Sequence, residues 1–164
     1  MKKINPFLWF NTEALDAAKF YVGIFKNSKI GKIAYYPKEA AEKIGREPGS
    51  VMTVEFTLDR VEFVALNGGP QFKFTEAISF AVNCETQDEI DYFWEKLSAD
   101  GGSTGPCGWL KDKFGLSWQV TPVFLGDMLA DRDVDKANRV MNAMMEMDKI
   151  DIAALNKAAA GLTA

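Results

Sequence analysis

The spacing of apolar residues in the first half of the chain predicts a strand, a helix and then three more strands. The first strand is the apolar run at residues 4–10, and Asn11 or Thr12 is expected to cap the helix that follows. Apolar residues recur every three or four positions along that helix, which predicts a buried face made of Leu15, Ala18, Val22 and Phe25. The later strands are expected at residues 30–36, 51–58 and 61–66, with a tight turn at Asp59 and Arg60 between the last two. The polar segment 37–50, which contains Pro and Gly, is expected to be an exposed excursion.

The second half of the chain repeats this order of elements. The segment AISFAVNC predicts a strand, and Thr86 and Glu89 have the spacing of a capping box at the start of a helix. A shift of 75 positions places Leu15, Ala18 and Val22 on Ile90, Phe93 and Leu97, and Phe7 on Val82. We interpret this coincidence of apolar positions as a weak internal duplication.

Beyond residue 125 the pattern becomes helical. Apolar residues lie at helical spacing in DVDKANRVMNAMMEMDKI, and a shorter segment, DIAALNKAAAG, follows it. Amphipathic helices of this length ordinarily dock on their own fold or on a second copy of the chain. We therefore expect the methionine-rich face to belong to the core or to a dimer seam.

Composition and charge exclude several classes of protein. The chain has 164 residues, a formal net charge of -4 and a pI near 5.0, and no cluster of Lys or Arg that would form a nucleic-acid groove. No apolar run reaches membrane-spanning length, and the first ten residues lack the pattern of a signal peptide. We therefore expect a cytoplasmic protein that binds neither nucleic acid nor membrane, with Cys84 and Cys107 reduced.

Several segments carry a resemblance to a known family. They are FLWFNTEALDAAKFYVGIF, VMTVEFTLD, ALNGGPQFKFTEAISFAVNC, CGWLKDKFGLSWQVTP and DIAAL. The chain resembles the PhnB-like branch of the vicinal oxygen chelate superfamily, which includes glyoxalase I and the bleomycin-resistance proteins. Members of this branch are often labelled 3-demethylubiquinone-9 3-methyltransferase-like.

This resemblance implies the fold. We expect an α+β fold with two βαβββ modules, at residues 1–70 and 71–125, followed by a C-terminal helical extension at 126–164. Together these parts make a single PhnB-like domain, 1–164. The resemblance also implies a cleft formed by curved sheets and a homodimer.

The same resemblance gives positions where metal enzymes of the superfamily place their ligands. They fall near Pro6, at Phe63, at Ile78 or Ser79, and at Gln119. A divalent ion needs several nitrogen or oxygen donors that converge from different strands, and the chain has no histidine. We therefore expect no bound metal. No Gly-rich turn opens a helix after a first strand, so the sequence supplies no cofactor loop, and we expect no cofactor.

Gln119 is the polar residue at the middle of the apolar strand GLSWQVTP. It is either a buried amide satisfied by backbone groups or a hydrogen-bonding anchor for a small ligand. Strand parity offers Asn67, Ser79 and Thr121 as companions, and Trp109, beside Gly108, is the best aromatic candidate for a pocket. Cys107 is expected to be a structural thiol, because no histidine is present to act as its base.

Two hypotheses for the function follow. The first is a small-molecule binding protein without a metal, whose cleft has aromatic and polar walls. The second is an enzyme. It would be a metal-dependent glyoxalase- or dioxygenase-like lyase or oxidoreductase, or the methyltransferase of the family label.

Overall fold

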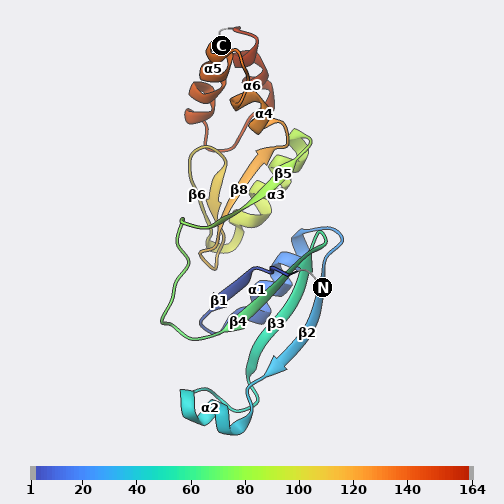
Figure 1. Ribbon diagram of the computed structural model, residues 1–164, viewed down its shortest axis with the longest axis vertical. Coiled ribbons are helices and arrows are strands. Elements are labelled where there is room, and N and C mark those ends of the chain that lie inside the picture. Colours follow the sequence, from blue (N-terminus) through green and yellow to red (C-terminus); the bar gives the residue numbers. More distant parts are fainter. Residues whose placement is uncertain (1–2, 163–164) are drawn as a thin grey trace. The chain divides into compact units, whose positions relative to one another are not determined.

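The computed structural model describes residues 3–162, which form two four-stranded sheets with helices (Figure 1). The strand order is β1-β4-β3-β2 in the first sheet and β5-β8-β7-β6 in the second. In each sheet the first and last strands of the repeat, β1 with β4 and β5 with β8, run parallel. The expected α+β fold of two βαβββ modules with C-terminal helices is therefore confirmed. The chain divides into two compact units, of which the first ends at Phe74 and the second begins at Thr75.

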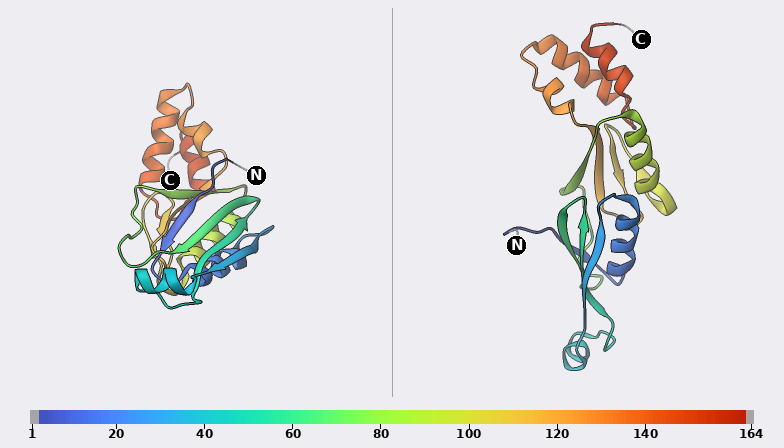
Figure 2. Two further views of the ribbon diagram at one scale, coloured as in Figure 1. Left: turned by 60° about the horizontal axis from the view of Figure 1, so that its bottom comes forward. Right: turned by 90° about the vertical axis from the view of Figure 1, so that its right-hand side faces the viewer.

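The first unit contains one sheet and the helix that covers one of its faces (Figure 2). Its elements are β1 (Phe7–Phe10), α1 (Ala14–Ile24), β2 (Lys29–Tyr35), α2 (Lys38–Ile44), β3 (Val51–Leu58) and β4 (Val61–Asn67). Tyr21 of α1 stacks on Phe56, and Phe56 stacks on Phe63 with 5.2 Å between the ring centroids. Asp59 and Arg60 both have positive φ, 38° and 69°, as a two-residue hairpin turn requires.

The buried face of α1 differs from the predicted one by about one position. The buried residues are Ala14, Ala17, Ala18, Tyr21 and Ile24, whereas Leu15, Val22 and Phe25 are only half-buried. Three alanines without long side chains let the helix lie close to the sheet, and this close packing outweighs the larger apolar residues beside them. The predicted cap is also wrong. The amide of Ala14 donates to the side chain of Asn67 at 2.8 Å, rather than to Asn11 or Thr12.

The expected exposed excursion contains the short helix α2. It ends at Gly45, which has φ of 68°, a left-handed conformation that glycine adopts at no steric cost. Ala41 is the buried residue of this helix, and the others are exposed. The excursion is therefore exposed as expected, although the sequence pattern did not predict its helix.

The second sheet has shorter strands and a helix on one face. Its elements are β5 (Ser79–Cys84), α3 (Gln87–Ser98), β6 (Ser103–Thr104), β7 (Trp109–Lys111) and β8 (Ser117–Pro122), with a 3-10 turn at Ala99–Gly101 after the helix. The capping signal is confirmed. The Thr86 hydroxyl accepts from the amide of Glu89 at 3.2 Å, and the Glu89 carboxylate accepts from the amide of Glu85 at 2.7 Å.

The strands and the helices of the two repeats align with two different sequence offsets, rather than with one. Leu8 and Phe10 of β1 are buried like Val82 and Cys84 of β5, an offset of 74 positions. Ala14 and Tyr21 of α1 correspond to Ile90 and Leu97 of α3 by burial, an offset of 76. The single offset of 75 lies between them and wrongly places Phe7, which is 60% exposed, on the buried Val82.

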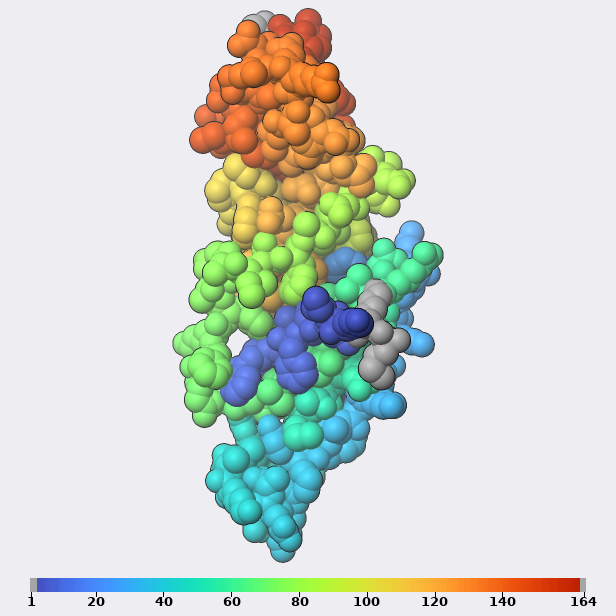
Figure 3. All heavy atoms as spheres, in the orientation of Figure 1, coloured from blue at the N-terminus to red at the C-terminus, as the bar shows by residue number. Residues whose placement is uncertain are grey.

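The helical extension packs on the second sheet's unit. It consists of α4 (Leu125–Leu129), α5 (Val134–Met145) and α6 (Ile152–Ala159), and Figure 3 shows these helices as one continuous mass of atoms. The carbonyls of Met147 and Asp148 each accept from a loop amide, those of Cys107 and Gly108, at 2.7 Å. The side chain of Gln87 on α3 donates to the carbonyl of Ile150 at 3.0 Å. No helix within residues 3–162 is long and apolar enough to cross a membrane.

Candidate functional site

The second sheet has an apolar face and a polar face. Val82, Cys84, Leu110, Trp118 and Val120 are buried on the face toward α3. Burial raises the pKa of the Cys84 thiol to about 12, with a smaller contribution from the nearby Glu89 carboxylate. Because side chains alternate along a strand, the residues between these positions point to the opposite face, which we call the open face. It carries Ser79, Ala81, Asn83, Trp109, Lys111, Ser117, Gln119 and Thr121.

Four polar residues form one row across the open face. Ser79 pairs with Ser117, Ser117 pairs with Lys111, and Lys111 pairs with Ser103. Residues directly opposite each other on neighbouring strands lie on the same face, with their Cβ atoms about 5 Å apart. This polar row, Ser79-Ser117-Lys111-Ser103, therefore carries one lysine and three serines on neighbouring strands.

Gln119 lies on the open face, two residues along β8 from Ser117 of the polar row. Its side-chain amide donates to the Ser79 hydroxyl at 2.8 Å, and it pairs across the strands with Ala81 and Trp109. Gln119 and Ser79 are thus in contact, Trp109 is directly opposite on β7, and Thr121 lies on the same face farther along β8. The partner of the Gln119 amide group is a side chain rather than the backbone.

Asn67 has a different environment. It is 7% exposed, on the helix-covered face of the first sheet, where its Oδ1 accepts from the amide of Ala14 and its Nδ2 donates to the carbonyl of Val51 at 3.0 Å. Its backbone carbonyl accepts from the Tyr36 hydroxyl at 2.7 Å. Both polar atoms of the side chain are therefore engaged in holding the first unit together, so we leave Asn67 out of the candidate site.

A cavity of about 530 Å³ lies at the β6–β7 side of the open face. Its lining residues include Glu76, Ser103, Thr104, Trp109, Leu110, Lys111 and Ser117. Trp109 is the sequence-predicted residue that lines it, and Gln119, Ser79 and Thr121 lie on the same face of the sheet outside the lining. Lys111 and Ser117 could have been found from the sequence, because they share the strand parity of Trp109 and Gln119. Glu76 could not, because it lies in an irregular segment before β5.

The loop before β7 fixes the position of Trp109. Cys107 and Gly108 both have positive φ, and the amide of Trp109 donates to the carbonyl of Pro106 at 3.1 Å. A Cβ on Gly108 would lie 2.7 Å from the carbonyl oxygen of Val120, which is closer than side chains approach. Glycine is therefore required at position 108, and the backbone of this loop lies directly against β8.

An ion pair between Lys111 and Glu76 lines the same cavity. The hydrogen bond from Lys111 holds the pKa of the Glu76 carboxyl below its ordinary value. Lys111 is on β7 and Glu76 precedes β5, and β8 lies between those two strands, so the ion pair spans β8. Ser117, on β8, is fully buried, and its hydroxyl is the buried side-chain polar atom of residues 3–162 that has no hydrogen-bond partner.

The positions carried over from the metal enzymes do not fit a metal site. Pro6 has no donor side chain, and Phe63 packs against Phe56 in the core of the first unit. Ile78 is a hydrocarbon, so Ser79 and Gln119 are the remaining donors, and they are bonded to each other. The described part of the chain also contains no group of three or more His, Cys, Asp or Glu side chains that could hold a metal.

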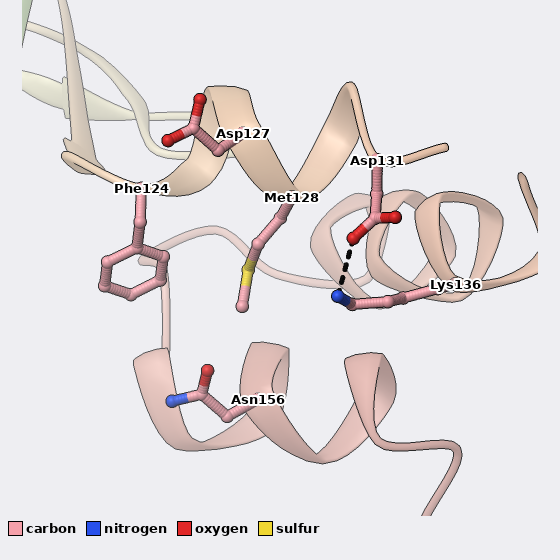
Figure 4. Close-up of a pocket in the computed structure, with 6 residues that line it drawn as sticks. All are labelled: Phe124, Asp127, Met128, Asp131, Lys136 and Asn156. Carbon is pink, nitrogen blue, oxygen red and sulfur yellow. Dashed lines mark hydrogen bonds and ion pairs between the residues drawn. The ribbon is translucent and has the colours of Figure 1, made fainter. Parts of the chain in front are cut away.

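A smaller cavity of about 280 Å³ lies among the helices of the extension (Figure 4). Figure 4 shows Met128 and Asn156 pointing toward each other from α4 and α6, with Phe124 beside them. At the opposite side, Lys136 forms an ion pair with Asp131 at 2.6 Å, which lowers the pKa of the Asp131 carboxyl. Every lining residue has an exposed or half-buried side chain, so this cavity is a shallow surface feature.

The chain is similar to proteins of known structure over most of its length. A Bacillus cereus protein assigned as a 3-demethylubiquinone-9 3-methyltransferase, PhnB protein, is 34% identical; the match covers 74% of this chain and 99% of that one, with a TM-score of 0.64. Two further structures show the same fold at lower identity. They are protein PA1353 of Pseudomonas aeruginosa (19% identical, 74% and 98% covered, TM-score 0.59) and the fosfomycin resistance protein FosX of Mesorhizobium loti (13% identical, 80% and 100% covered, TM-score 0.55).

No curated protein matches the chain. The sequence model of one family, described as 3-demethylubiquinone-9 3-methyltransferase, matches residues 2–121. That match covers both βαβββ modules as far as β8 and leaves the whole helical extension outside. The chain therefore belongs to the 3-demethylubiquinone-9 3-methyltransferase-like, PhnB-like family of the vicinal oxygen chelate superfamily.

Proposed function

We propose that this protein binds a small molecule on the open face of its second sheet, without a metal ion. The observation that carries the proposal is the Ser117 hydroxyl, which is fully buried, lines the cavity and has no hydrogen-bond partner. Buried hydroxyls are generally hydrogen-bonded, and an unmade bond costs about 1–3 kcal/mol. In the liganded protein, a polar atom of the ligand would form a hydrogen bond with this hydroxyl. Before the ligand binds, a water that it later displaces would do so.

The rest of the cavity supports the same proposal. Its volume of about 530 Å³ falls within the size of typical small-molecule pockets. Trp109 and Pro106 supply an apolar wall, and Lys111 and Ser103 supply polar groups. Gln119 and Ser79 continue the polar surface beside the cavity, where they would contact a ligand that extends along β8.

Methyl transfer, the reaction in the family's description, receives no support from the residues around the cavity. The connections from β1 to α1 and from β5 to α3 are Asn11-Thr12-Glu13 and Glu85-Thr86, and neither contains the glycines that bring a backbone close to a nucleotide-like cofactor. The donor set for a metal enzyme is likewise incomplete, as described above. Binding therefore explains more of the site than either enzymatic alternative.

A thermal-shift screen against a panel of organic acids, amides, alcohols and aromatic compounds tests the proposal. A compound that binds the folded protein at a hundred times its Kd should stabilise it by about 2.7 kcal/mol. The shift should shrink in Ser117→Ala and Trp109→Ala and persist in Ser98→Ala, which removes a hydroxyl bonded within α3. The shift should also survive treatment with EDTA, and elemental analysis should find no stoichiometric transition metal. A panel without any stabilising compound, or a shift abolished by EDTA, would contradict the proposal.

A further inference from the structure

The cavity on the open face holds one cation and one anion among its lining residues, and they are paired with each other. Lys111 is the cation, with 40% of its side chain exposed, and Glu76 is the anion, with 62% exposed. The chain as a whole is acidic, with a formal net charge of -4. A cationic side chain in such a cavity offers a specific contact to an anionic ligand.

We propose that the ligand of this site carries a carboxylate, and that Glu76 occupies the place of that carboxylate on Lys111 in the unliganded protein. This inference rests on the proposed function, because it assigns a chemical class to the ligand of the same cavity. Glu76 lies in the irregular segment before β5, so its side chain can swing away from Lys111 without breaking a strand.

The position of the ion pair explains why the two states would exchange. The pair spans β8 at the level of Ser117, whose hydroxyl is buried and without a partner. A ligand carboxylate beside Lys111 would accept from the Lys111 ammonium with one oxygen and from the Ser117 hydroxyl with the other. The hydrogen bond to Ser117 is a gain that Glu76 does not make, because the Ser117 hydroxyl has no partner while Glu76 is on Lys111.

The strength of the existing pair also favours exchange. Ion pairs between exposed side chains contribute little, because water and salt screen them. A carboxylate inside the cavity would be less exposed than Glu76, and charge-assisted hydrogen bonds strengthen as water is excluded.

The charge balance at Lys111 favours a ligand with a single negative charge. Exchange of one carboxylate for another leaves Lys111 neutralised, whereas a dianion would add an uncompensated negative charge.

The wall of the cavity suggests the rest of the ligand. Trp109 lies on the open face two residues along β7 from Lys111, and Pro106 lines the same side. A flat apolar group can pack against an indole ring at small entropic cost. An aromatic or similarly planar carboxylate therefore fits both contacts, and benzoate is the simplest probe of this kind.

Titration with benzoate and with benzamide, its neutral analogue, tests the proposal by following the Trp109 indole resonance in NMR spectra. Benzoate should shift this resonance and benzamide should bind at least about tenfold more weakly, because it lacks the charge that Lys111 recognises. Glu76→Gln should tighten benzoate binding about two- to fivefold, because it removes the internal competitor. Lys111→Met should weaken it about tenfold or more, and Ser117→Ala about three- to tenfold.

A matched ion pair provides the control. Lys113 and Asp100 form an exposed pair two residues beyond Lys111, away from the cavity lining. Lys113→Met and Asp100→Asn make the same charge changes and should leave benzoate binding as in the parent protein.

Three outcomes would overturn the inference. They are equal binding of benzoate and benzamide, equal effects of the Lys111 and Lys113 variants, and phosphate binding as tight as benzoate, which would indicate a general anion site. If neutral compounds from the thermal-shift panel bind through Trp109 and Ser117 while benzoate does not bind Glu76→Gln, the carboxylate assignment is wrong and the proposed function stands. If no compound of either kind binds, the proposed function fails first.

Discussion

The side chain of Asn67, at the end of β4, accepts a hydrogen bond from the backbone amide of Ala14, which lies 53 positions earlier at the start of α1. The same side chain donates to the carbonyl of Val51 on β3. One buried amide thus replaces a local cap and ties the helix to two strands of its sheet. This arrangement assigns Asn67 a structural role.

Asn67→Ala should therefore destabilise the protein. Loss of a helix cap costs about 0.5–2 kcal/mol, and the second buried hydrogen bond adds about 1 kcal/mol. We expect the free energy of unfolding, measured by urea denaturation, to fall by about 1.5–3 kcal/mol. Asn11→Ala is the control, because Asn11 is at the expected cap position that the structure does not use. An equal loss in both variants would argue against this role for Asn67.

Gln119→Leu should leave stability nearly unchanged. The amide donates to Ser79, which is half-buried, so the Ser79 hydroxyl can bond to water in the variant. We expect the free energy of unfolding to change by less than about 0.5 kcal/mol. Asp112→Ala is the comparison. The buried Asp112 carboxylate accepts from two backbone amides and the Trp118 indole, so its removal should cost about 3 kcal/mol or more. A clear drop for Gln119→Leu would remove Gln119 from the site.

The ion pair between Asp91 and Lys149 should make the docking of the extension depend on pH. The hydrogen bond from Lys149 is the main cause that lowers the pKa of the Asp91 carboxyl from its ordinary value of 3.8. A carboxyl with a lower pKa in the folded state stabilises the protein above the unfolded pKa, and this contribution disappears as the pH falls through the folded pKa. Asp91→Asn should therefore lower the urea midpoint at pH 7, and the difference from the parent should shrink below about pH 4. Asp88→Asn, earlier on the same helix, removes the same charge outside the Asp91–Lys149 ion pair and serves as the control.

The two cysteines should differ in reactivity toward a thiol reagent. Cys84 is fully buried and its pKa is raised to about 12, so the reactive thiolate is scarce at neutral pH. Cys107 is half-buried in the loop before β7. Labelling with iodoacetamide followed by mass spectrometry should modify Cys107 first, and Cys84 should react only after unfolding. Equal rates for both thiols in the folded protein would contradict the buried position of Cys84.

The homodimer implied by the family remains a prediction. Large apolar side chains lie exposed in each unit, such as Phe7 at 60% and Ile78 at 70% exposure, and both sheets end in edge strands. Exposed apolar surface and unpaired edges are commonly covered by a second copy. Light scattering at micromolar concentration should give the mass of a dimer, and Phe7→Asp should shift it toward the monomer. A monomer of the parent protein at that concentration would contradict the prediction.

Signals confined to a few neighbouring residues predicted the structure well. The capping box at Thr86 and Glu89 and the turn at Asp59 and Arg60 are both present, because their hydrogen bonds and dihedral angles depend on adjacent residues. Signals that depend on packing were less reliable. The buried face of α1 is set by close approach to the sheet, and the cap of α1 comes from Asn67 on a distant strand.

The residues of the candidate site likewise fall into those that the sequence could predict and those that it could not. Strand parity places Ser79, Trp109 and Gln119 on one face, and the same parity extends to Lys111 and Ser117. The sequence alone could not pair Lys111 with Glu76, because no periodicity describes the irregular segment that carries Glu76. It also could not reveal that Ser117 lacks a partner, which depends on everything packed around it.

The hydrogen bonds from Cys107 and Gly108 to the carbonyls of Met147 and Asp148 determine how far the chain can be shortened at its C-terminal side. The loop that supplies these amides leads directly to Trp109, so the pocket's aromatic wall is braced by a stretch of chain beyond residue 121, where the family's shared sequence ends. A version trimmed to that shared length would lose Pro122, the last residue of β8, and keep the other strand residues of both sheets, yet it would remove two acceptors from the Trp109 loop. The segment between α5 and α6 therefore supports the Trp109 loop, and a shortened chain keeps both of these acceptors only if it extends at least to Asp148.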